Sequence, residues 1–440
     1  MQPSDTLPPT SRHSEVSGSD SAAAPSENRY YVLAILTLGY ALNIADRFSI
    51  STLIEPIKHE LQLSDSGVGY LTGVALALFY VTVGIPVAVL ADKANRRNIL
   101  AAALLIWSGM TVVCGFAKTF GQLMLGRFGV GIGEAGGTAP STSILADQFP
   151  PAKRPFALTV FALGACLGAW LGSSVAGAAA ERSGWRAAFL LLGAPGVALA
   201  LIVWFTIKEP PRGVFDRARP PAGTLRETLR FIAKQRSAIH LIIGGAVATL
   251  WSWGLMWWTP AFLQRSHQMT VGGAGQLLGP MHLIAGTAST LLAAWLMSRR
   301  SAADPRHIAN LLALFVAVST VPSFLAYWVS STSLASIFLW LFVPGVYFYI
   351  GPILGLLQNV LPANMRATGC ASLLFLANIG NLVVAPQFIG WLSDWFRSHS
   401  SAGDESLRWS LLILAPTGLW AAWHLWRAGR TIRQDEASVS

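Results

Sequence analysis

Residues 208–237 read KEPPRGVFDRARPPAGTLRETLRFIAKQRS, the only long polar stretch between the hydrophobic windows of the chain. Its four prolines disfavour a regular helix or strand. On each side lie six windows of about 20 mostly apolar residues, the length at which a helix crosses the hydrocarbon core of a bilayer. The stretch therefore predicts a cytosolic linker between two six-helix halves, residues 30–207 and 238–428.

The windows predict twelve transmembrane helices and an all-α membrane protein. Only 12% of the 440 residues are charged, whereas soluble proteins carry about 25%. Strands are excluded because the windows are too long and lack period-two alternation. The windows begin near Tyr30, Val68, Asn98, Phe120, Pro155 and Arg186, and then near Ala238, Gly272, His307, Ser333, Arg366 and Leu407.

The lysines and arginines predict the orientation of these helices. With the N-terminus inside, twenty of them fall on cytosolic loops and tails and seven on outer loops, which satisfies the positive-inside rule. The net charge of +10 then reflects topology and contact with anionic lipid, and no nucleic-acid partner is needed to explain it. Residues 1–29 lack the features of a cleavable signal and predict a disordered cytosolic tail; residues 429–440 form a second one. The absence of an Asn-x-Ser/Thr sequon and the short tails favour a bacterial inner membrane.

An internal repeat supports the division into two bundles. The segments 151–154 (PAKR) and 362–366 (PANMR) follow the fourth and tenth windows, and Gly177 with Glu181 matches Gly390 with Asp394. The offsets are 211 to 213 residues. Two bundles of one design are typical of secondary transporters.

Ionisable residues inside membrane spans are costly and mark functional sites by default. Asn43, Asp46 and Arg47 share one helix face of the first span, and Arg127 and Glu134, seven residues apart, share one face of the fourth. We expect both faces to meet in a watery cavity between the two halves, where movement of the arginines relative to Glu134 would change its proton affinity and couple protons to conformation. The alternative is a static buried ion network that only holds helices together.

The second half is different, since spans seven to ten have no Asp, Glu, Lys or Arg in their interiors. Polar mid-span side chains there are Asn378 and Asn381. Its spans offer aromatic residues instead, namely Trp251, Trp253, Trp257, Trp258, Tyr347, Phe348 and Tyr349.

Residues 88–97, AVLADKANRR, lie between spans two and three. An acid at a helix end followed by basic residues can pair across a closed cytosolic gate, although ordinary positive-inside charge would look the same. The predicted gate residues are Asp92, Lys93, Arg96, Arg97, Asp147 and Arg154.

Small residues in two spans predict close helix packing. They are Gly129, Gly131, Gly133, Gly136 and Gly137 in span four, and Gly164, Gly168 and Gly172 in span five. The three cysteines lie apart in apolar stretches and predict neither a disulfide framework nor a metal site.

At these residues the chain resembles the major facilitator superfamily. Residues 88–97 are similar to its gate motif, Gly-x-x-x-Asp-Arg-x-Gly-Arg-Arg/Lys, with Asp92, Arg96 and Arg97 retained, and Ala88, Lys93 and Asn95 as departures. The corresponding loop of the second half ends in Arg299 and Arg300 without the acid. Several segments resemble the spinster branch, namely NIADR at 43–47, RFGVGIGEA at 127–135, WR at 185–186 and EPPRG at 209–213.

The resemblance implies alternating access with proton coupling at Glu134, and lysophospholipid or sphingoid-phosphate substrates in animal members. The charge asymmetry fits such an amphipathic anion: Arg47 and Arg127 would bind its head group. Proton coupling is expected to involve Asp46, Arg47, Arg127 and Glu134. Further substrate-binding residues are expected to be Asn43, Trp251, Trp257, Tyr347 and Asn378.

The sequence thus predicts a secondary transporter and not an enzyme, working as a monomer among membrane lipids without a cofactor other than protons. No Gly-x-x-x-x-Gly-Lys-Ser/Thr loop is present, which argues against a primary pump. Two alternatives remain open. One is a transporter of small organic anions or drugs, and the other is a non-transporting membrane receptor or scaffold.

Overall fold

The computed structural model describes residues 28–75, 82–84, 86–87, 90–91, 93–212, 215, 224–298 and 304–438 of the chain. Within these ranges the regular elements are helices. The predicted tail up to residue 27, the gate residue Asp92, and Arg299 and Arg300 lie outside the described residues.

The first bundle is built around α1 (Arg29–Thr52), which is followed by the short α2 (Ile54–Leu61). Its other elements are α3 (Asp65–Gly69), η1 (Tyr70–Val74), α5 (Arg96–Cys114), α6 (Phe120–Glu134), α7 (Thr138–Gln148), η2 (Pro151–Lys153), α8 (Arg154–Trp170), η3 (Leu171–Val175), α9 (Ala176–Ser183) and α10 (Trp185–Thr206).

The second bundle follows α11 (Leu225–Ile232) and begins with the long α12 (Arg236–Ser266). Its other elements are α13 (Val271–Pro280), η4 (Met281–Gly286), α14 (Thr287–Ser298), α15 (Pro305–Trp328), α16 (Thr332–Tyr347), α17 (Ile350–Asn359), α18 (Arg366–Asn378), η6 (Ile379–Val384), α19 (Ala385–His399), η7 (Gly403–Glu405), α20 (Ser406–Leu414) and α21 (Thr417–Ala437).

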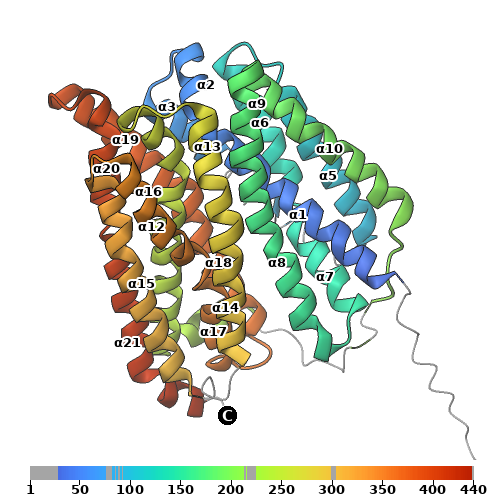
Figure 1. Cartoon of the computed structure of the whole chain (residues 1–440). Helices are drawn as coiled ribbons and strands as arrows, with labels where there is room; N and C mark the ends of the chain where they lie inside the picture. Colours follow the sequence, from blue (N-terminus) through green and yellow to red (C-terminus); the bar gives the residue numbers. More distant parts are fainter. Residues whose placement is uncertain are drawn as a thin grey trace, which may run out of the picture.

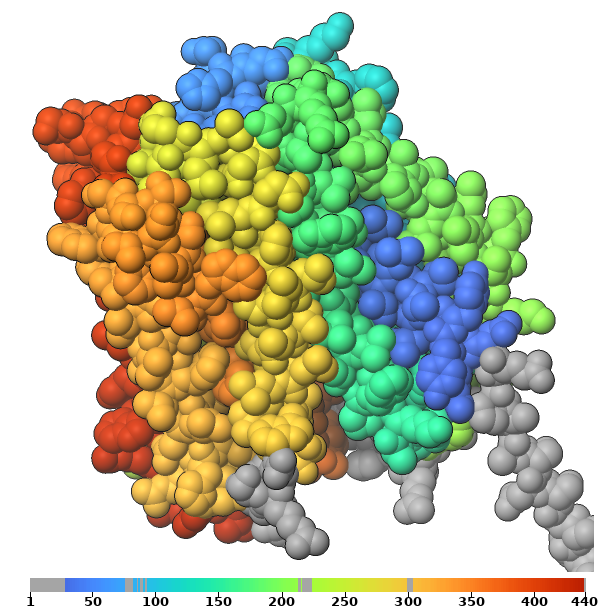
Figure 2. Space-filling view, viewed as in Figure 1, coloured from blue at the N-terminus to red at the C-terminus, as the bar shows by residue number. Residues whose placement is uncertain are grey.

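The two bundles stand side by side (Figure 1). We call the lower end in this view, where α21 ends, the cytosolic end, as the charge distribution predicts, and the upper end, with α2, α3, α9 and α13, the outer end. Helices α8 and α9 of the first bundle lie against α13, η4 and α14 of the second (Figure 2). On another side, α3 and η1 contact α19 and η6.

The predicted helix starts are confirmed to within three residues, from Arg29 for the first span to Ser406 for the twelfth. Nine helical segments of the described residues are long and apolar enough to cross a membrane. Spans two, four and twelve are not among them. Span two contains residues outside the described ranges, span four is interrupted between Glu134 and Thr138, and span twelve is divided into α20 and the less apolar α21.

Two segments contain more helix than their sequences suggest. Within the linker, a capping box favours α11. The Thr224 hydroxyl accepts a hydrogen bond from the backbone N–H of Glu227, and the Glu227 carboxylate accepts one from the backbone N–H of Thr224. Two amides at the start of the helix thereby gain partners. The predicted tail from residue 429 continues α21 as far as Ala437.

The glycines of spans four and five pack as predicted. A Cβ on Gly168 would lie 2.2 Å from the backbone oxygen of Ala41, and one on Gly172 would lie 2.4 Å from that of Ala45, so α8 and η3 can approach α1 only through glycine. Gly133 meets the backbone of Trp107 on α5 in the same way. Through these contacts α1 packs closely against α8 and η3, and α6 packs closely against α5.

A π-helical stretch interrupts each of spans two, five, eight and eleven, as η1, η3, η4 and η6. The pairs η1 and η4, and η3 and η6, begin 211 and 208 residues apart, close to the offsets of the sequence repeat. All four stretches belong to the helices at which the bundles meet. Such stretches are frequent at functional sites, and here they mark the repeat at the level of backbone geometry.

Candidate transport site

The four predicted charged residues meet as two ion pairs. Arg47 on α1 donates from Nε to Glu134 Oε2 at 2.9 Å, and its Nη2 lies 2.6 Å from the same oxygen. Arg127 on α6 donates from Nη1 to Asp46 Oδ2 at 2.5 Å. Each arginine thus pairs with the acid of the other helix, so that α1 and α6 are connected twice.

Both pairs are withdrawn from solvent. The Glu134 side chain is 0% exposed and that of Arg127 is 1% exposed, whereas Arg47 retains 13%. Asp46 accepts a second hydrogen bond, at 2.6 Å, from Thr111 on α5. The more accessible pair is therefore the one that contains Glu134.

Two polar atoms of the cluster lack a hydrogen-bond partner among the described residues, Glu134 Oε1 and Arg127 Nε. Both are buried. A carboxylate with one oxygen bonded to a guanidinium and the other unpaired can accept a proton without first breaking its ion pair. Glu134 is the last residue of α6.

An aromatic cluster of the second bundle faces these charges across the bundle interface. Phe48 of α1 packs against Trp257 of α12, with ring centroids 5.0 Å apart, and against His282 of η4 at 4.8 Å. Tyr347 donates to or accepts from His282 Nδ1 at 3.0 Å and packs edge-on to Trp253. Trp253, His282 and Phe48 were not predicted as site residues, because apolar residues and a lone histidine give no distinguishing sequence signal.

A small cavity lies where charges and aromatic rings meet. Arg47 and Arg127 line it together with Trp257 and Leu382 of the second bundle, and its volume is about 10 Å³, room for about one water molecule. The Trp257 indole N–H donates to Asn381 Oδ1 at 2.6 Å. The two arginines therefore lie next to the bundle interface, and the space beside them is much narrower than the watery cavity that the sequence predicts.

The other predicted substrate residues lie in different places. Trp251 is fully buried inside the second bundle, where its Nε1 donates to Ser323 Oγ and its ring packs on Phe342. It therefore faces its own bundle and not the interface, a correction to its predicted role. Asn378 ends α18 and is half-buried, while Asn43 is buried in a small cavity lined by residues of the first bundle.

Most of the predicted gate residues that the structure describes take part in polar contacts at the cytosolic end of the first bundle. Arg96 forms an ion pair with Asp147 and donates from Nε to Glu209 Oε1 at 2.7 Å. Arg97 donates its backbone N–H to Glu209 Oε2, and Arg154 donates to the backbone oxygen of Ala146. Lys93 is exposed. These contacts connect parts of the first bundle, and their service as a gate stays a prediction.

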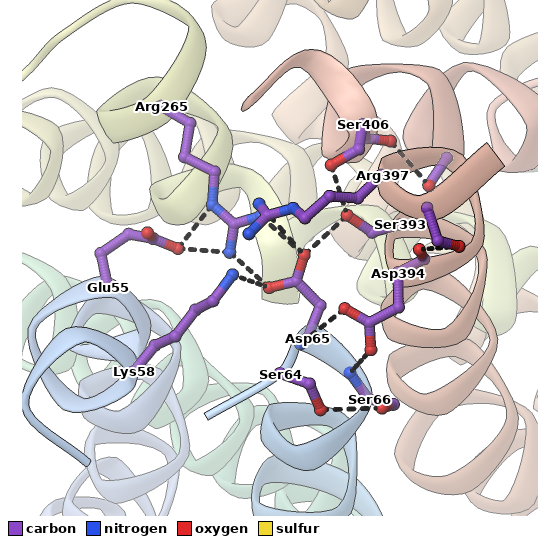
Figure 3. A network of polar contacts seen from close by, with 12 residues as sticks. Glu55, Lys58, Ser64, Asp65, Ser66, Arg265, Ser393, Asp394, Arg397 and Ser406 are labelled. Atoms are coloured by element: carbon purple, nitrogen blue, oxygen red, sulfur yellow. Dashed lines mark hydrogen bonds and ion pairs between the residues drawn. The ribbon is translucent and has the colours of Figure 1, made fainter. Parts of the chain in front are cut away.

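A second charged network, which the sequence analysis did not predict, joins the bundles at the outer end (Figure 3). Asp65, at the start of α3, is fully buried and accepts two hydrogen bonds from Arg265 of α12, at 2.8 and 2.7 Å. Lys58 lies 2.5 Å from Asp65, and Glu55 accepts from Arg265 at 2.7 Å. Burial alone would raise the pKa of Asp65, but the hydrogen bonds and charges of Arg265 and Lys58 hold that pKa well below its usual range.

Comparison with known proteins agrees with this architecture. The family model of the Major Facilitator Superfamily matches residues 36–385. An MFS-type efflux pump of Mycolicibacterium smegmatis is 31% identical over 408 residues, 92% of this chain and 93% of the pump. The sphingosine-1-phosphate transporter SPNS2 of Mus musculus is 26% identical over 419 residues, which cover 87% of this chain and 72% of the relative.

Among solved structures, a bacterial homolog of the human lysosomal transporter Spinster, in an inward-facing and unoccupied conformation, superposes with a TM-score of 0.80. It is 28% identical, and the match covers 93% of this chain and 98% of that one. The match to the family model, the helical architecture and these relatives lead to one conclusion: the chain belongs to the Major Facilitator Superfamily and is a spinster-like membrane transporter.

Proposed function

We propose that this transporter is proton-coupled and moves an amphipathic anion, such as a lysophospholipid or a sphingoid phosphate, by alternating access. The observation that carries the proposal is the environment of Glu134, a buried carboxylate paired with the partly accessible Arg47 and with one oxygen unpaired among the described residues. Arg47 itself lines a small cavity at the bundle interface.

Arg47 is the more exposed of the two central arginines, so it is the one that an incoming anion would reach. A phosphate bound there would compete with the Glu134 carboxylate for the guanidinium. Glu134 would then have lost its counter-charge in a buried place, which favours the protonated acid.

Proton and anion are therefore expected to bind cooperatively, and by linkage each would raise the affinity of the protein for the other. The pair Arg127–Asp46 is supported by Thr111, and it would keep the local geometry while Arg47 exchanges partners. The apolar part of the ligand would lie along Phe48, Trp257 and Tyr347, once the bundles part enough to widen the small cavity.

The inner membrane of a bacterium, with both termini in the cytosol, is the proposed location. It rests on the excess of basic residues at the cytosolic end, twenty against seven. We also propose that the monomer is the transporting unit, since the described charged site is completed by residues of one chain.

The test is counterflow in proteoliposomes with a lysophospholipid, a sphingoid phosphate, a small organic anion and a cationic dye. Glu134→Gln should retain counterflow of the lipid anion but lose its dependence on pH, because glutamine resembles the protonated acid. Glu60→Gln is the matched control, since Glu60 binds Trp185 and Arg186 within the first bundle. If Glu134→Gln keeps the pH profile of the wild type, the coupling role is wrong.

The efflux pump among the relatives favours one second candidate, export of drug-like amphiphiles. The same panel separates the two. Transport of the cationic dye without transport of either lipid anion would support drug export and would contradict binding of an anionic head group by Arg47.

A further inference from the structure

The last helix, α21, lies at the margin of the second bundle and reaches the cytosolic end (Figure 1). It packs on α12 and α15 of its own bundle. Four large side chains of its cytosolic half are exposed, and because they recur every three or four residues they share one face of the helix. They are Trp423, Trp426, Arg427 and Arg430. We call them the arginine–indole face, and none of them belongs to the central site.

The length of span twelve places this face at the depth of lipid head groups. The span begins at Ser406 at the outer end, and Arg427 follows 21 residues later. A helix of that length rises about 32 Å, whereas the hydrocarbon core is about 30 Å thick. The two indoles therefore lie at the inner boundary of the hydrocarbon, and the two arginines lie just beyond it, in the cytosolic leaflet.

Each of the two arginines is stacked on an indole ring. The guanidinium carbon of Arg430 lies 3.9 Å from the ring centroid of Trp426, and that of Arg427 lies 5.7 Å from the ring centroid of Trp423. Both distances are within the range of about 6 Å over which a cation is attracted to a ring. A guanidinium that stacks through its flat face keeps the N–H donors of its edge for a phosphate. Because the arginines are already ordered, a ligand would bind them at a smaller entropic cost.

Neither arginine of the face is paired with an acid among the described residues, whereas Arg433, one turn farther along α21, forms an ion pair with Asp304. The face therefore presents two ordered positive charges without a counter-charge. A basic residue near the surface of an anionic leaflet strengthens binding by about fivefold. This charge is complementary to a lipid head group that is negative overall, and a zwitterionic head group would bring a cation of its own.

The neighbouring helix α12 contributes a polar ring beside the face. The ring of His240 packs edge-on against Trp423, with centroids 5.7 Å apart. The Nδ1 atom of His240 shares a hydrogen bond of 2.9 Å with Nδ1 of the buried His424 on α21. The hydrogen bond holds His240 and α21 together, so that two helices build the surroundings of the arginines.

We propose that the arginine–indole face is a binding site for one anionic diacyl phospholipid of the cytosolic leaflet. The phosphate would bridge Arg427 and Arg430, which are neighbours three residues apart on the helix surface. Trp423 and Trp426 would contact the glycerol region and the first part of the acyl chains, where indoles are favoured. The bound lipid would be a component of the surrounding membrane and not a transported solute, so the site does not depend on what the central site carries.

The experiment is native mass spectrometry of the delipidated transporter in detergent, titrated with phosphatidylglycerol or phosphatidylcholine. The wild type should bind one phosphatidylglycerol about tenfold or more tightly than phosphatidylcholine. The double variant Arg427→Gln with Arg430→Gln should bind phosphatidylglycerol about tenfold or more weakly, because two charges are lost, and should bind phosphatidylcholine unchanged. Arg306→Gln is the matched control, since it removes an exposed arginine at the cytosolic start of α15 in the same bundle.

A further variant tests the stacking. Trp426→Leu keeps an apolar side chain at the inner boundary of the hydrocarbon but removes the ring beneath Arg430. We expect about threefold weaker binding of phosphatidylglycerol, the loss of one cation–π contact. Affinity unchanged from that of the wild type would contradict the role given to the indole.

Two results would overturn the site as a whole. One is equal affinity for phosphatidylglycerol in the double variant and in Arg306→Gln, which would mean that general positive charge attracts the lipid. The other is loss of phosphatidylglycerol binding in Arg47→Gln, which would mean that the lipid occupies the central site. Binding that survives Arg47→Gln and fails in the double variant supports the proposal, whatever the pH profile of Glu134→Gln.

Discussion

At the scale of single residues, the two central ion pairs differ in how deeply the arginine is buried. Arg127 is 1% exposed and holds Asp46, which is 4% exposed. Arg127→Gln leaves this acid buried with Thr111 as its remaining described partner, and we expect a loss of about 3–5 kcal/mol in the free energy of unfolding. Thermal unfolding in detergent measures it, with the exposed Arg182 changed to Gln as control. Equal unfolding temperatures for the two variants would show that the pair contributes little.

The contacts of Asp65 in the outer network predict how the stabilisation from its ion pairs depends on pH. The folded pKa of Asp65 lies below its ordinary value, so the stabilisation from its ion pairs is fully present above about pH 4 and is lost only as the pH falls through the lower, folded pKa. His59, 3.8 Å from Glu55, is 81% exposed, and its pairing should be weak. The difference in unfolding temperature between the wild type and Asp65→Asn should therefore stay the same between about pH 5.5 and 8. A smaller difference at the lower pH would mean that the ion pairs of Asp65 titrate within this range.

The central charges could be predicted from sequence because ionisable residues inside apolar windows are rare, and helix spacing places them on common faces. Their pairing, Arg47 with Glu134 and Arg127 with Asp46, could not, since it depends on how two helices rotate against each other. The outer network was missed for another reason. Asp65 and Arg265 stand at the ends of spans, where charges are ordinary, and they are 200 residues apart.

At the scale of elements, contact between α8 and α1 depends on glycine. Gly168→Ala places a Cβ 2.2 Å from the oxygen of Ala41, a backbone atom that cannot move without shifting the helix. We expect a lower unfolding temperature and a smaller yield of monodisperse protein. Gly109→Ala on α5 is the control, since nothing lies within 4 Å of its added Cβ. If both substitutions behave alike, close helix contact at Gly168 is not what stabilises the bundle.

Helix starts were predictable because apolar windows and charged ends are local features. The interruptions were not. They are the break after Glu134 and the π-helical stretches η1, η3, η4 and η6. Such interruptions depend on contacts with neighbouring helices, which a hydropathy pattern does not contain. Helix α11 was not predicted, because the four prolines of the linker disfavour a regular helix. Its capping box, Thr224 with Glu227, is nevertheless visible in the sequence.

At the scale of the whole molecule, the repeat predicted two bundles of one design, but no sequence feature tells which end of the interface is closed. The described hydrogen bonds of Ser51, Ser174 and Asp394 to the other bundle lie toward the outer end. A direct consequence is that a covalent link at that end should stop transport. The positions 181 and 272 are suitable, because a Cβ on Gly272 would lie 3.4 Å from the Cβ of Glu181, close to disulfide geometry.

We therefore expect the double variant Glu181→Cys with Gly272→Cys to form a disulfide on oxidation, seen as a loss of maleimide labelling. Transport of any substrate found by counterflow should fall by about tenfold or more on oxidation and recover on reduction, because each cycle requires α9 and α13 to separate at the outer end. Each single cysteine variant should be insensitive to oxidant. If the disulfide forms and transport continues at the reduced rate, these helices do not part during the cycle, and the outer end must open elsewhere on the interface.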